Sequence, residues 1–269
     1  MIWVNGVLQA SIAPTDRGLA YGDGLFATMR SSKRGILFFQ QHQARLETGA
    51  ARLGFDWQMS PALAEQLDTL AAQYPQHCIK LMVTRGVGGR GYAPPEQVNV
   101  TEVVSVHPIP AHYAAWQQQG IRLKTSAVQL GHQPLLAGIK HLNRLEQVLI
   151  KSLPLPQGYD DWLVLDCMGK VIESSMANIF FIKDNQVVTP SLEHCGVAGV
   201  MREQVMLALL ALQMDIDCLP FGAERLVEFD SAFITNSVLG VVDVLAIDSH
   251  SFKPSPLTAD LRQTLSLSL

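Results

Sequence analysis

Closely spaced cysteines are missing from this chain. Four cysteines occur among 269 residues, and no two of them form a Cys-x-x-Cys pair. Structural zinc sites and the disulfide frameworks of small secreted domains both depend on clustered cysteines. We therefore expect neither a metal site nor disulfides, and the pattern is typical of a reducing compartment.

Excess charge and long apolar runs are also missing. Charged residues make up 16% of the chain and the formal net charge is -4, which leaves no broad basic field for nucleic acid or an anionic membrane. No apolar stretch approaches the ~18 residues of a membrane helix, and the N-terminus lacks the basic start and long apolar segment of a signal peptide. We expect a cytoplasmic protein that binds neither nucleic acid nor membrane.

The chain does contain enough apolar material for a large core. Hydrophobic residues make up 48% of it, and a chain of this length buries roughly 70 to 75% of the surface that its unfolded form exposes. The length suits one large or two modest domains.

The first part of the sequence alternates strand and helix patterns. Asn5-Gly6 accepts the two positive φ angles of a type I′ turn, so it predicts a hairpin between the apolar runs 2–4 and 7–10. The further elements predicted here are helices over 42–54 and 61–73 and strands over 78–85 and 98–107. These residues describe an α+β unit.

A change in composition at residues 107–120, with prolines and a run of glutamines, indicates a join between domains. We predict a small N-terminal domain over 1–110, a linker over 111–120 and a larger C-terminal domain over 121–269. In the larger domain the predicted strands are 121–128, 162–165, 178–182, 186–189, 232–235 and 241–246, and the predicted helices are 142–151, 201–212 and, as a helix or turn, 224–229.

Two side chains of the larger domain carry reactive chemistry. Lys140 lies between a loop with glycine and proline and a helical pattern, and Glu173 ends a strand pattern that Asn178 resumes. An amine that can form a Schiff base and a carboxylate that can hold a ring nitrogen protonated are what pyridoxal phosphate chemistry asks of a protein. Taken singly, Lys140 also suits a surface lysine and Glu173 a solvated edge carboxylate.

A candidate phosphate site follows. Residues 196–202, with the sequence GVAGVMR, lead into the predicted helix 201–212. Glycine-rich backbone at a helix N-terminus offers free N–H groups to a phosphate. An ordinary helix start explains the same pattern.

Several motifs in one order resemble those of fold-type IV pyridoxal phosphate enzymes. Residues 141–147 (HLNRLEQ) are similar to the segment after the Schiff-base lysine of that fold type, and the likeness extends from residues 16–24 to 236–237. Within the fold type the chain resembles the aminodeoxychorismate lyases. The resemblance implies a small N-terminal α/β domain and a larger C-terminal β-barrel-like α/β domain. It also implies pyridoxal 5'-phosphate between the two domains, and a homodimer.

The resemblance gives the matched residues roles. Lys140 is then the catalytic lysine that also binds the cofactor, and Glu173 bonds the pyridine nitrogen. The phosphate contacts that the resemblance implies are the amides of Val200 and Met201, the pair Asn236 and Ser237, and the side chain of Arg45. For Arg45 the alternative is a solvated helix arginine. At the place of Arg144 the branched-chain aminotransferases carry a tyrosine nearby, which counts against that activity and leaves the role of Arg144 open.

A glycine-rich loop needs a separate interpretation. Residues 86–91 fit Gly-x-Gly-x-x-Gly after a strand, but Pro94 and Pro95 cannot open the helix that a dinucleotide site requires. Residues 85–92 (RGVGGRGY) resemble instead a loop over the active site of the lyases. Since arginine pairs well with carboxylates, Arg90 and Tyr92 are predicted to bind substrate, unless the loop is only a tight turn.

The predicted activity follows from these assignments. It is a lyase reaction that converts the small molecule 4-amino-4-deoxychorismate to 4-aminobenzoate and pyruvate, a step of folate biosynthesis. Thr28, in the strand pattern after a glycine-rich turn, is a further substrate candidate or a plain strand residue. The alternatives are a fold-type IV aminotransferase for D-amino or branched-chain acids, and a protein that only stores pyridoxal phosphate.

Overall fold

The computed structural model of the protein describes residues 1–8 and 11–269. By its internal contacts the chain divides into two compact units. The first unit comprises Met1–Ile109 and Ile139–Asn143, and the second comprises Pro110–Gly138 and Arg144–Leu269. Lys140 therefore belongs to the first unit, although the rest of the first unit ends thirty residues before Ile139.

The first unit is an antiparallel sheet in the order β2-β1-β6-β5-β3-β4. Its strands are β1 (Ile2–Val4), β2 (Val7–Leu8), β3 (Gly24–Ser32), β4 (Gly35–Ile36), β5 (His77–Thr84) and β6 (Thr101–Pro108), and its helices are α1 (Arg17–Tyr21), α2 (Phe39–Arg52) and α3 (Pro61–Gln73). The predicted turn is confirmed, since Asn5 has φ 48° and Gly6 has φ 79°. Of the predicted strand 7–10, residues 9 and 10 lie outside the described residues.

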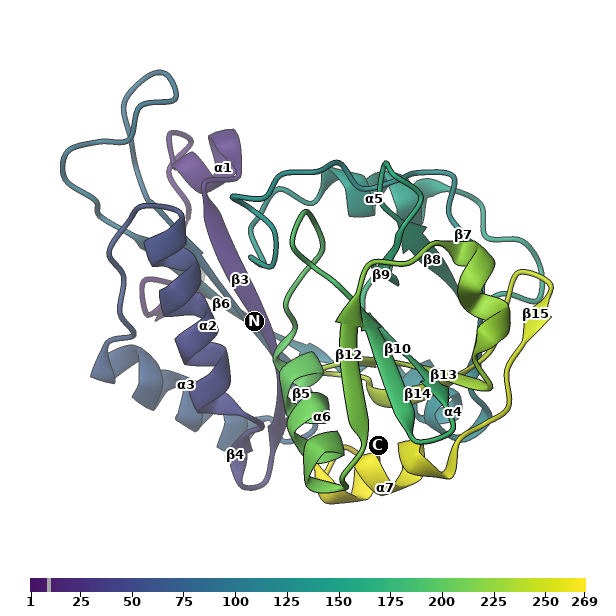
Figure 1. Cartoon of the computed structure of the whole chain (residues 1–269). Helices are drawn as coiled ribbons and strands as arrows, with labels where there is room; N and C mark the ends of the chain where they lie inside the picture. The colour runs from purple at the N-terminus through teal and green to yellow at the C-terminus, as the bar shows by residue number, and fades with distance from the viewer. Residues whose placement is uncertain (9–10) are drawn as a thin grey trace. The chain divides into compact units, whose positions relative to one another are not determined.

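One face of this sheet carries the core of the first unit. Leu25, Ala27 and Met29 alternate along β3 and are buried together with apolar side chains of α2 and α3. Both helices contact β3, and they lie beside it in Figure 1. Because side chains alternate along a strand, Phe26 and Thr28 point to the opposite face.

The second unit is a sheet that closes on itself. Strand pairs run in the ring β10-β13-β14-β7-β8-β9, and the pairing of Glu173 with Asn178 joins β9 back to β10. The strands are β7 (Ile121–Thr125), β8 (Asp161–Leu165), β9 (Val171–Ser174), β10 (Asn178–Lys183), β11 (Gln186–Pro190), β12 (Asp215–Leu219), β13 (Ser231–Asn236), β14 (Gly240–Ile247) and β15 (His250–Ser251). The ring confirms the predicted barrel-like sheet.

The helices of the second unit lie between these strands in sequence. They are α4 (His112–Gln119), α5 (Leu145–Ser152), α6 (Val200–Ala211), the 3-10 helix η1 (Ala223–Glu228) and α7 (Pro256–Thr264). The predicted helices near 142–151 and 201–212 are confirmed as α5 and α6 with slightly shifted ends. Among residues 1–8 and 11–269, no helix is long and apolar enough to cross a membrane.

The stretch expected to link two domains is folded instead. Residues 112–119 form α4, and the buried Gln117 amide donates to the carbonyls of Leu239, at 2.6 Å, and Leu267, at 2.9 Å. The glutamine run gives no apolar periodicity, so the sequence did not indicate a helix here. Partners more than a hundred residues away fix it in the second unit.

Candidate active site

Lys140 is held against the edge of β3 by backbone hydrogen bonds. The Phe26 amide donates to the Lys140 carbonyl at 3.0 Å, and the Leu142 amide donates to the Gly24 carbonyl at 2.9 Å. The Lys140 ammonium lies 4.6 Å from the centroid of the Phe26 ring, close enough for a cation–π contact. The lysine thus projects over the sheet face opposite the core.

Other polar groups share this face. Thr28 is two residues from Phe26 and pairs with Lys80 of β5. The Lys80 ammonium lies 4.9 Å from the same Phe26 ring, and burial lowers the pKa of Lys80 below its usual value. The predicted substrate residue Thr28 and the predicted catalytic Lys140 therefore lie on one side of the first unit's sheet.

Helix α2 carries the predicted phosphate residue Arg45. It also carries His42, which the sequence did not indicate as a site residue. His42 is only 1% exposed, and neither of its ring nitrogens has a hydrogen-bond partner. The Nε of Arg45, three residues on, is also buried without a partner. Burial, together with the charges of Arg45 and Lys140, lowers the pKa of His42 to about 3, and burial lowers the pKa of Arg45 to about 10.

Such unsatisfied groups are uncommon. Buried polar atoms in folded proteins nearly always have a protein or water partner, so three of them on adjacent turns of one helix indicate a place for a polar ligand or ordered water. From the sequence, Arg45 was the residue of this helix predicted to contact the cofactor, and His42 was not predicted.

Glu173 lies where the sheet of the second unit closes. Its Oε2 accepts a hydrogen bond from the Val197 amide at 3.1 Å and another from the Asn178 side chain at 3.5 Å. Asn178 also donates to the Val197 carbonyl at 2.8 Å. The carboxyl group is buried and oriented by these contacts, as a group that bonds a ligand in a fixed direction must be.

Charge near Glu173 comes from Arg144. Burial lowers the pKa of Arg144 from its usual value, while the negative charges of Glu173 and Glu146 oppose that change. The arginine whose role the sequence left open is thus an electrostatic neighbour of the predicted cofactor carboxylate.

The start of α6 has an open backbone. Gly199 is the N-cap and supplies no side-chain cap, and Val200 and Met201 are the first two helical residues. Their amides have no acceptor within the helix because the first turn lacks one. A Cβ atom on Gly199 would overlap the Asn178 side chain, so glycine is needed for this close approach.

The turn after β13 contains the other predicted phosphate residues. The Asn236 side-chain oxygen accepts from the amides of Val238, at 2.9 Å, and Leu239, at 2.8 Å, and its amide donates to the Met176 carbonyl at 3.2 Å. Asn236 thereby fixes the turn, on which Ser237 is half-buried.

The loop with the predicted substrate residues is exposed. Tyr92 is 86% exposed and its ring meets Tyr21 edge-on at 5.5 Å, and Arg90 is exposed as well. Arg85, which stands in the same motif, is different. It is buried, and its guanidinium forms an ion pair with Asp23 at 2.7 Å.

One cluster in the second unit has metal-ligand residue types. Donor atoms of His132, Asp166 and Cys195 lie within 4.8 Å of one another. His132 pairs with Asp166 at 2.8 Å, and burial together with the Asp166 charge raises the pKa of the Cys195 thiol to about 12. Metals bind thiolates, so these contacts describe a hydrogen bond between His132 and Asp166 beside a protonated thiol.

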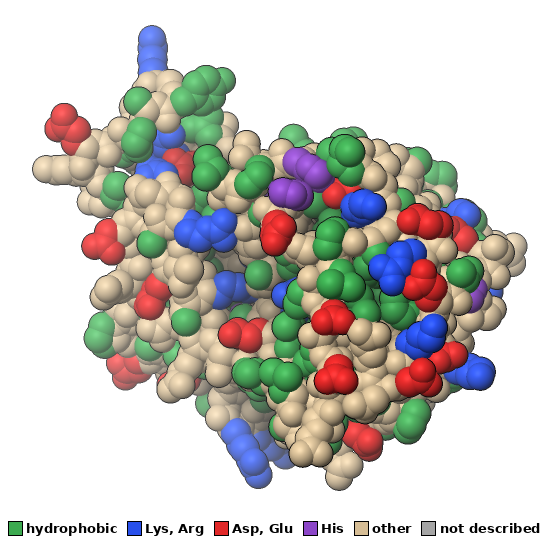
Figure 2. Space-filling model, viewed as in Figure 1, with side chains coloured by type: hydrophobic (Ala, Val, Ile, Leu, Met, Phe, Trp, Pro, Cys, Tyr) green, Lys and Arg blue, Asp and Glu red, His purple; other side chains and the backbone are tan. Residues whose placement is uncertain are grey.

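Surface charge is mixed in sign on one face of the molecule. On the face shown in Figure 2, side chains of both signs are interspersed, in keeping with a net charge of -4.

An open antiparallel sheet in one unit and a sheet that closes on itself in the other match the fold-type IV architecture, which confirms the predicted fold class. Residues 24–247 match the family of class IV amino-transferases, and the chain belongs to this family. It is 37% identical to the aminodeoxychorismate lyase of Vibrio harveyi, over 94% of this chain and 93% of that protein.

Two further relatives extend the comparison. A crystal structure of 4-amino-4-deoxychorismate lyase from Pseudomonas aeruginosa superposes with a TM-score of 0.94 at 37% identity, covering 100% of both chains. A putative branched-chain-amino-acid aminotransferase of Methanocaldococcus jannaschii is 30% identical over 93% of this chain and 88% of that protein. The family thus includes relatives named for two different reactions.

Proposed function

We propose that this protein is a pyridoxal phosphate-dependent lyase that converts 4-amino-4-deoxychorismate to 4-aminobenzoate and pyruvate. The observation that carries the proposal is the full-length likeness to two lyases at 37% identity. The chain is less similar, at 30% identity, to a putative aminotransferase. That likeness supports the same cofactor but a different reaction, the transfer of an amino group.

The residues present fit pyridoxal phosphate. Lys140 offers the amine, Glu173 an oriented carboxylate, and the first turn of α6 the open amides of Val200 and Met201. Arg45 has a buried Nε without a partner, which a phosphate oxygen would satisfy. We propose that Asn236 and Ser237 complete the phosphate contacts through the turn that Asn236 holds.

Within the second unit, the segment that ends at Gly138 lies beside the loop that contacts Glu173. Gly138 pairs with Val197, and the Val197 amide donates to Glu173. Only Ile139 separates Gly138 from Lys140 in sequence. When bound, the cofactor supplies an electron-withdrawing ring next to the substrate amine.

The protein's own groups then have separate tasks. Glu173 would hold a proton at the pyridine nitrogen, and the Lys140 amine would take the proton from the amine-bearing carbon of the substrate. The bond from the adjacent carbon to the enolpyruvyl oxygen breaks, which leaves an aromatic ring. The enolpyruvate leaves with that electron pair, gains a proton and becomes pyruvate, so no water or oxidant is consumed.

Substrate binding falls to the first unit. The substrate has two carboxylates, and the guanidinium fork of Arg90 suits either one. We assign Arg90, Tyr92 and Thr28 to substrate contacts. The exposure of Arg90 and Tyr92 leaves their side chains accessible to an incoming ligand.

A direct assay tests the proposed reaction. Purified protein is incubated with 4-amino-4-deoxychorismate, with and without added pyridoxal phosphate, and 4-aminobenzoate and pyruvate are quantified. Equimolar release of both supports the lyase. If neither forms while the protein still shows the visible absorption of lysine-bound cofactor, the aminotransferase takes its place, for a branched-chain or D-amino acid.

We also propose that the protein acts as a homodimer in the cytoplasm. Leu145, Val148 and Leu149 of α5 are each more than half exposed, and apolar side chains grouped on one helix are typical of an interface. Light scattering after size-exclusion chromatography measures the mass. A mass of one chain would contradict the dimer.

A further inference from the structure

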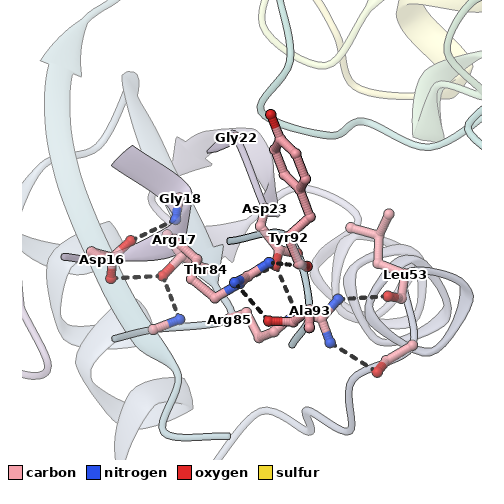
Figure 3. A network of polar contacts seen from close by, with 12 residues as sticks. Asp16, Arg17, Gly18, Gly22, Asp23, Leu53, Thr84, Arg85, Tyr92 and Ala93 are labelled. Atoms are coloured by element: carbon pink, nitrogen blue, oxygen red, sulfur yellow. Dashed lines mark hydrogen bonds and ion pairs between the residues drawn. The ribbon is translucent and has the colours of Figure 1, made fainter. Parts of the chain in front are cut away.

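Arg17 is buried at the start of α1 and binds a loop far away in sequence. Its guanidinium donates to the carbonyls of Gly91 at 3.2 Å, Tyr92 at 2.9 Å and Ala93 at 3.2 Å. Its side chain is only 5% exposed. Figure 3 shows this arginine beside Tyr92 and Ala93. Three successive carbonyls are thus fixed by one side chain.

Asp23 joins Arg17 to a second buried arginine. One carboxylate oxygen of Asp23 contacts the Nε of Arg17 and the Nε of Arg85, each at 2.7 Å. Arg85 also donates to the carbonyls of Leu53 at 2.7 Å and Gly54 at 2.9 Å, just after α2. The ion pairs therefore connect the loop to a helix end and to the strand β5.

Burial of Asp23 would by itself raise the pKa of its carboxyl group. The hydrogen bonds and positive charges of Arg85 and Arg17 outweigh that effect and hold the pKa of Asp23 below its usual value. The carboxylate remains charged, and both arginines keep their partner, throughout the neutral pH range.

The start of the loop is attached separately. The Arg17 amide donates to the Gly86 carbonyl at 2.8 Å, and the Gly88 amide donates to the Thr15 carbonyl at 3.3 Å. A Cβ atom on Gly88 would lie 2.6 Å from the Arg17 Cδ, whereas one on Gly89 would meet nothing within 4 Å. Gly88 thus leaves the room that the Arg17 side chain occupies.

We infer that Arg17 is a positioning residue, which with Asp23 and Arg85 holds the loop 86–93 so that Arg90 and Tyr92 are presented to a substrate carboxylate. The inference deepens the proposed function and rests on it for the identity of the substrate. The guanidinium of Arg17 donates to main-chain carbonyls and thereby fixes the loop. The exposed Arg90 is then the arginine of this loop that is available to bind an anion.

The two adjacent glycines provide a matched test. Gly88→Ala forces the Arg17 side chain to move, and Gly89→Ala adds the same methyl group to open space. Each variant is digested with trypsin, and cleavage after Arg90 is followed by mass spectrometry. Since a hydrogen bond from a charged donor is worth a factor of roughly 10 or more, we expect cleavage about 10-fold faster in Gly88→Ala and near the wild-type rate in Gly89→Ala.

Kinetics then separate positioning from general damage. In Gly88→Ala we expect the KM for 4-amino-4-deoxychorismate to rise about 10-fold with kcat within about 3-fold, because a misplaced loop weakens substrate binding. The absorption of lysine-bound cofactor should be unchanged. Arg17→Lys should show the same pattern, since one ammonium cannot bind three carbonyls and Asp23 as the guanidinium does. Arg34→Lys, at an exposed position, is its control.

Each outcome bears on one part of the inference. Equal cleavage of Gly88→Ala and Gly89→Ala would overturn the role of Arg17 in holding the loop. Faster cleavage with an unchanged KM would overturn the link from loop to substrate. Cleavage is measured without substrate, so it still tests the loop if the wild-type protein fails to release 4-aminobenzoate, which would reject the proposed function alone.

Discussion

The two units differ in the chemical groups that their predicted cofactor-binding residues offer. In the first unit these are long cationic side chains, such as Lys140 and Arg45, around an open antiparallel sheet. In the second unit they are a buried carboxylate and open backbone amides, at the point where the sheet closes. Side chains can reach a ligand from a distance, whereas amides require the backbone itself to come close.

That difference predicts different sensitivities. A site made of side chains is lost by removing one functional group and tolerates small changes in nearby backbone. A site made of amides has no side chain to remove, but an added methyl group can close it. Gly199, where any Cβ would overlap Asn178, illustrates the second case.

The largest effect is expected at Lys140. Lys140→Ala should reduce turnover by at least about 1,000-fold, because it removes the amine that we propose carries the cofactor and acts as the general base. Lys80→Ala is the matched control, since its ammonium lies over the same Phe26 ring, and we expect a loss of less than about 10-fold. Near-normal release of 4-aminobenzoate by Lys140→Ala would reject the assignment.

Glu173→Gln tests the carboxylate of the second unit. The amide keeps an acceptor for the Val197 amide but does not hold a proton at the pyridine nitrogen, so kcat should fall roughly 100-fold or more. Glu146→Gln is the comparison, because Glu146 is likewise an acceptor from a backbone amide, that of Gly131. Steady-state kinetics on both variants decide. Similar kcat values for the two would contradict the role of Glu173.

Gly199→Ala addresses the backbone amides directly. The added methyl group must displace Asn178 or the start of α6, so we expect pyridoxal phosphate to bind about 10-fold more weakly. Gly131→Ala serves as control, since its Cβ would be in ordinary contact at 3.5 Å. Fluorescence titration of the cofactor-free proteins measures the change. Equal affinities would show that the close approach at Gly199 is unimportant for the cofactor.

His42 should make the cofactor-free protein sensitive to mild acid. Its pKa is lowered to about 3, whereas an unfolded histidine titrates near about 6.5. Between these values the unfolded chain binds a proton that the folded chain does not, so stability falls as pH decreases, by about 1.4 kcal/mol per pH unit.

The variant His42→Gln removes the imidazole that binds a proton in the unfolded chain. Urea unfolding midpoints at pH 7 and pH 5 should drop further in the wild type than in the variant. His107→Gln, at an exposed histidine, should follow the wild type. The same drop in all three proteins would mean that His42 titrates normally.

Much of the fold was predicted from local pattern. Apolar residues at helical spacing after Pro61 predicted the helix 61–73, which α3 confirms, and Asn5-Gly6 predicted the first turn. The strand carrying Thr28 was expected from its pattern, but its pairing with β5 was not. α7 and β12 were not predicted, because their short patterns are only half apolar and resemble loops.

The candidate site divides in the same way. Lys140 and Glu173 stand in long, specific motifs whose chemistry is recognisable in the sequence. The contacts among Arg17, Asp23 and Arg85 were not recognisable in the sequence, although each of these residues belongs to a motif described above. Arg17 binds carbonyls more than seventy residues away, and no local pattern encodes such a partner.

The sequence alone determined the short-range features of this protein, which are its turns, most of its helices and strands, and the side-chain types that its proposed site can use. These depend on backbone preferences and side-chain types within a few residues. Only the tertiary structure decided that residues 112–119 form a helix, that Glu173 sits where a sheet closes, and that His42 is buried without a partner. Burial and charge pairing act between residues distant in sequence, so they exist only once the chain has folded.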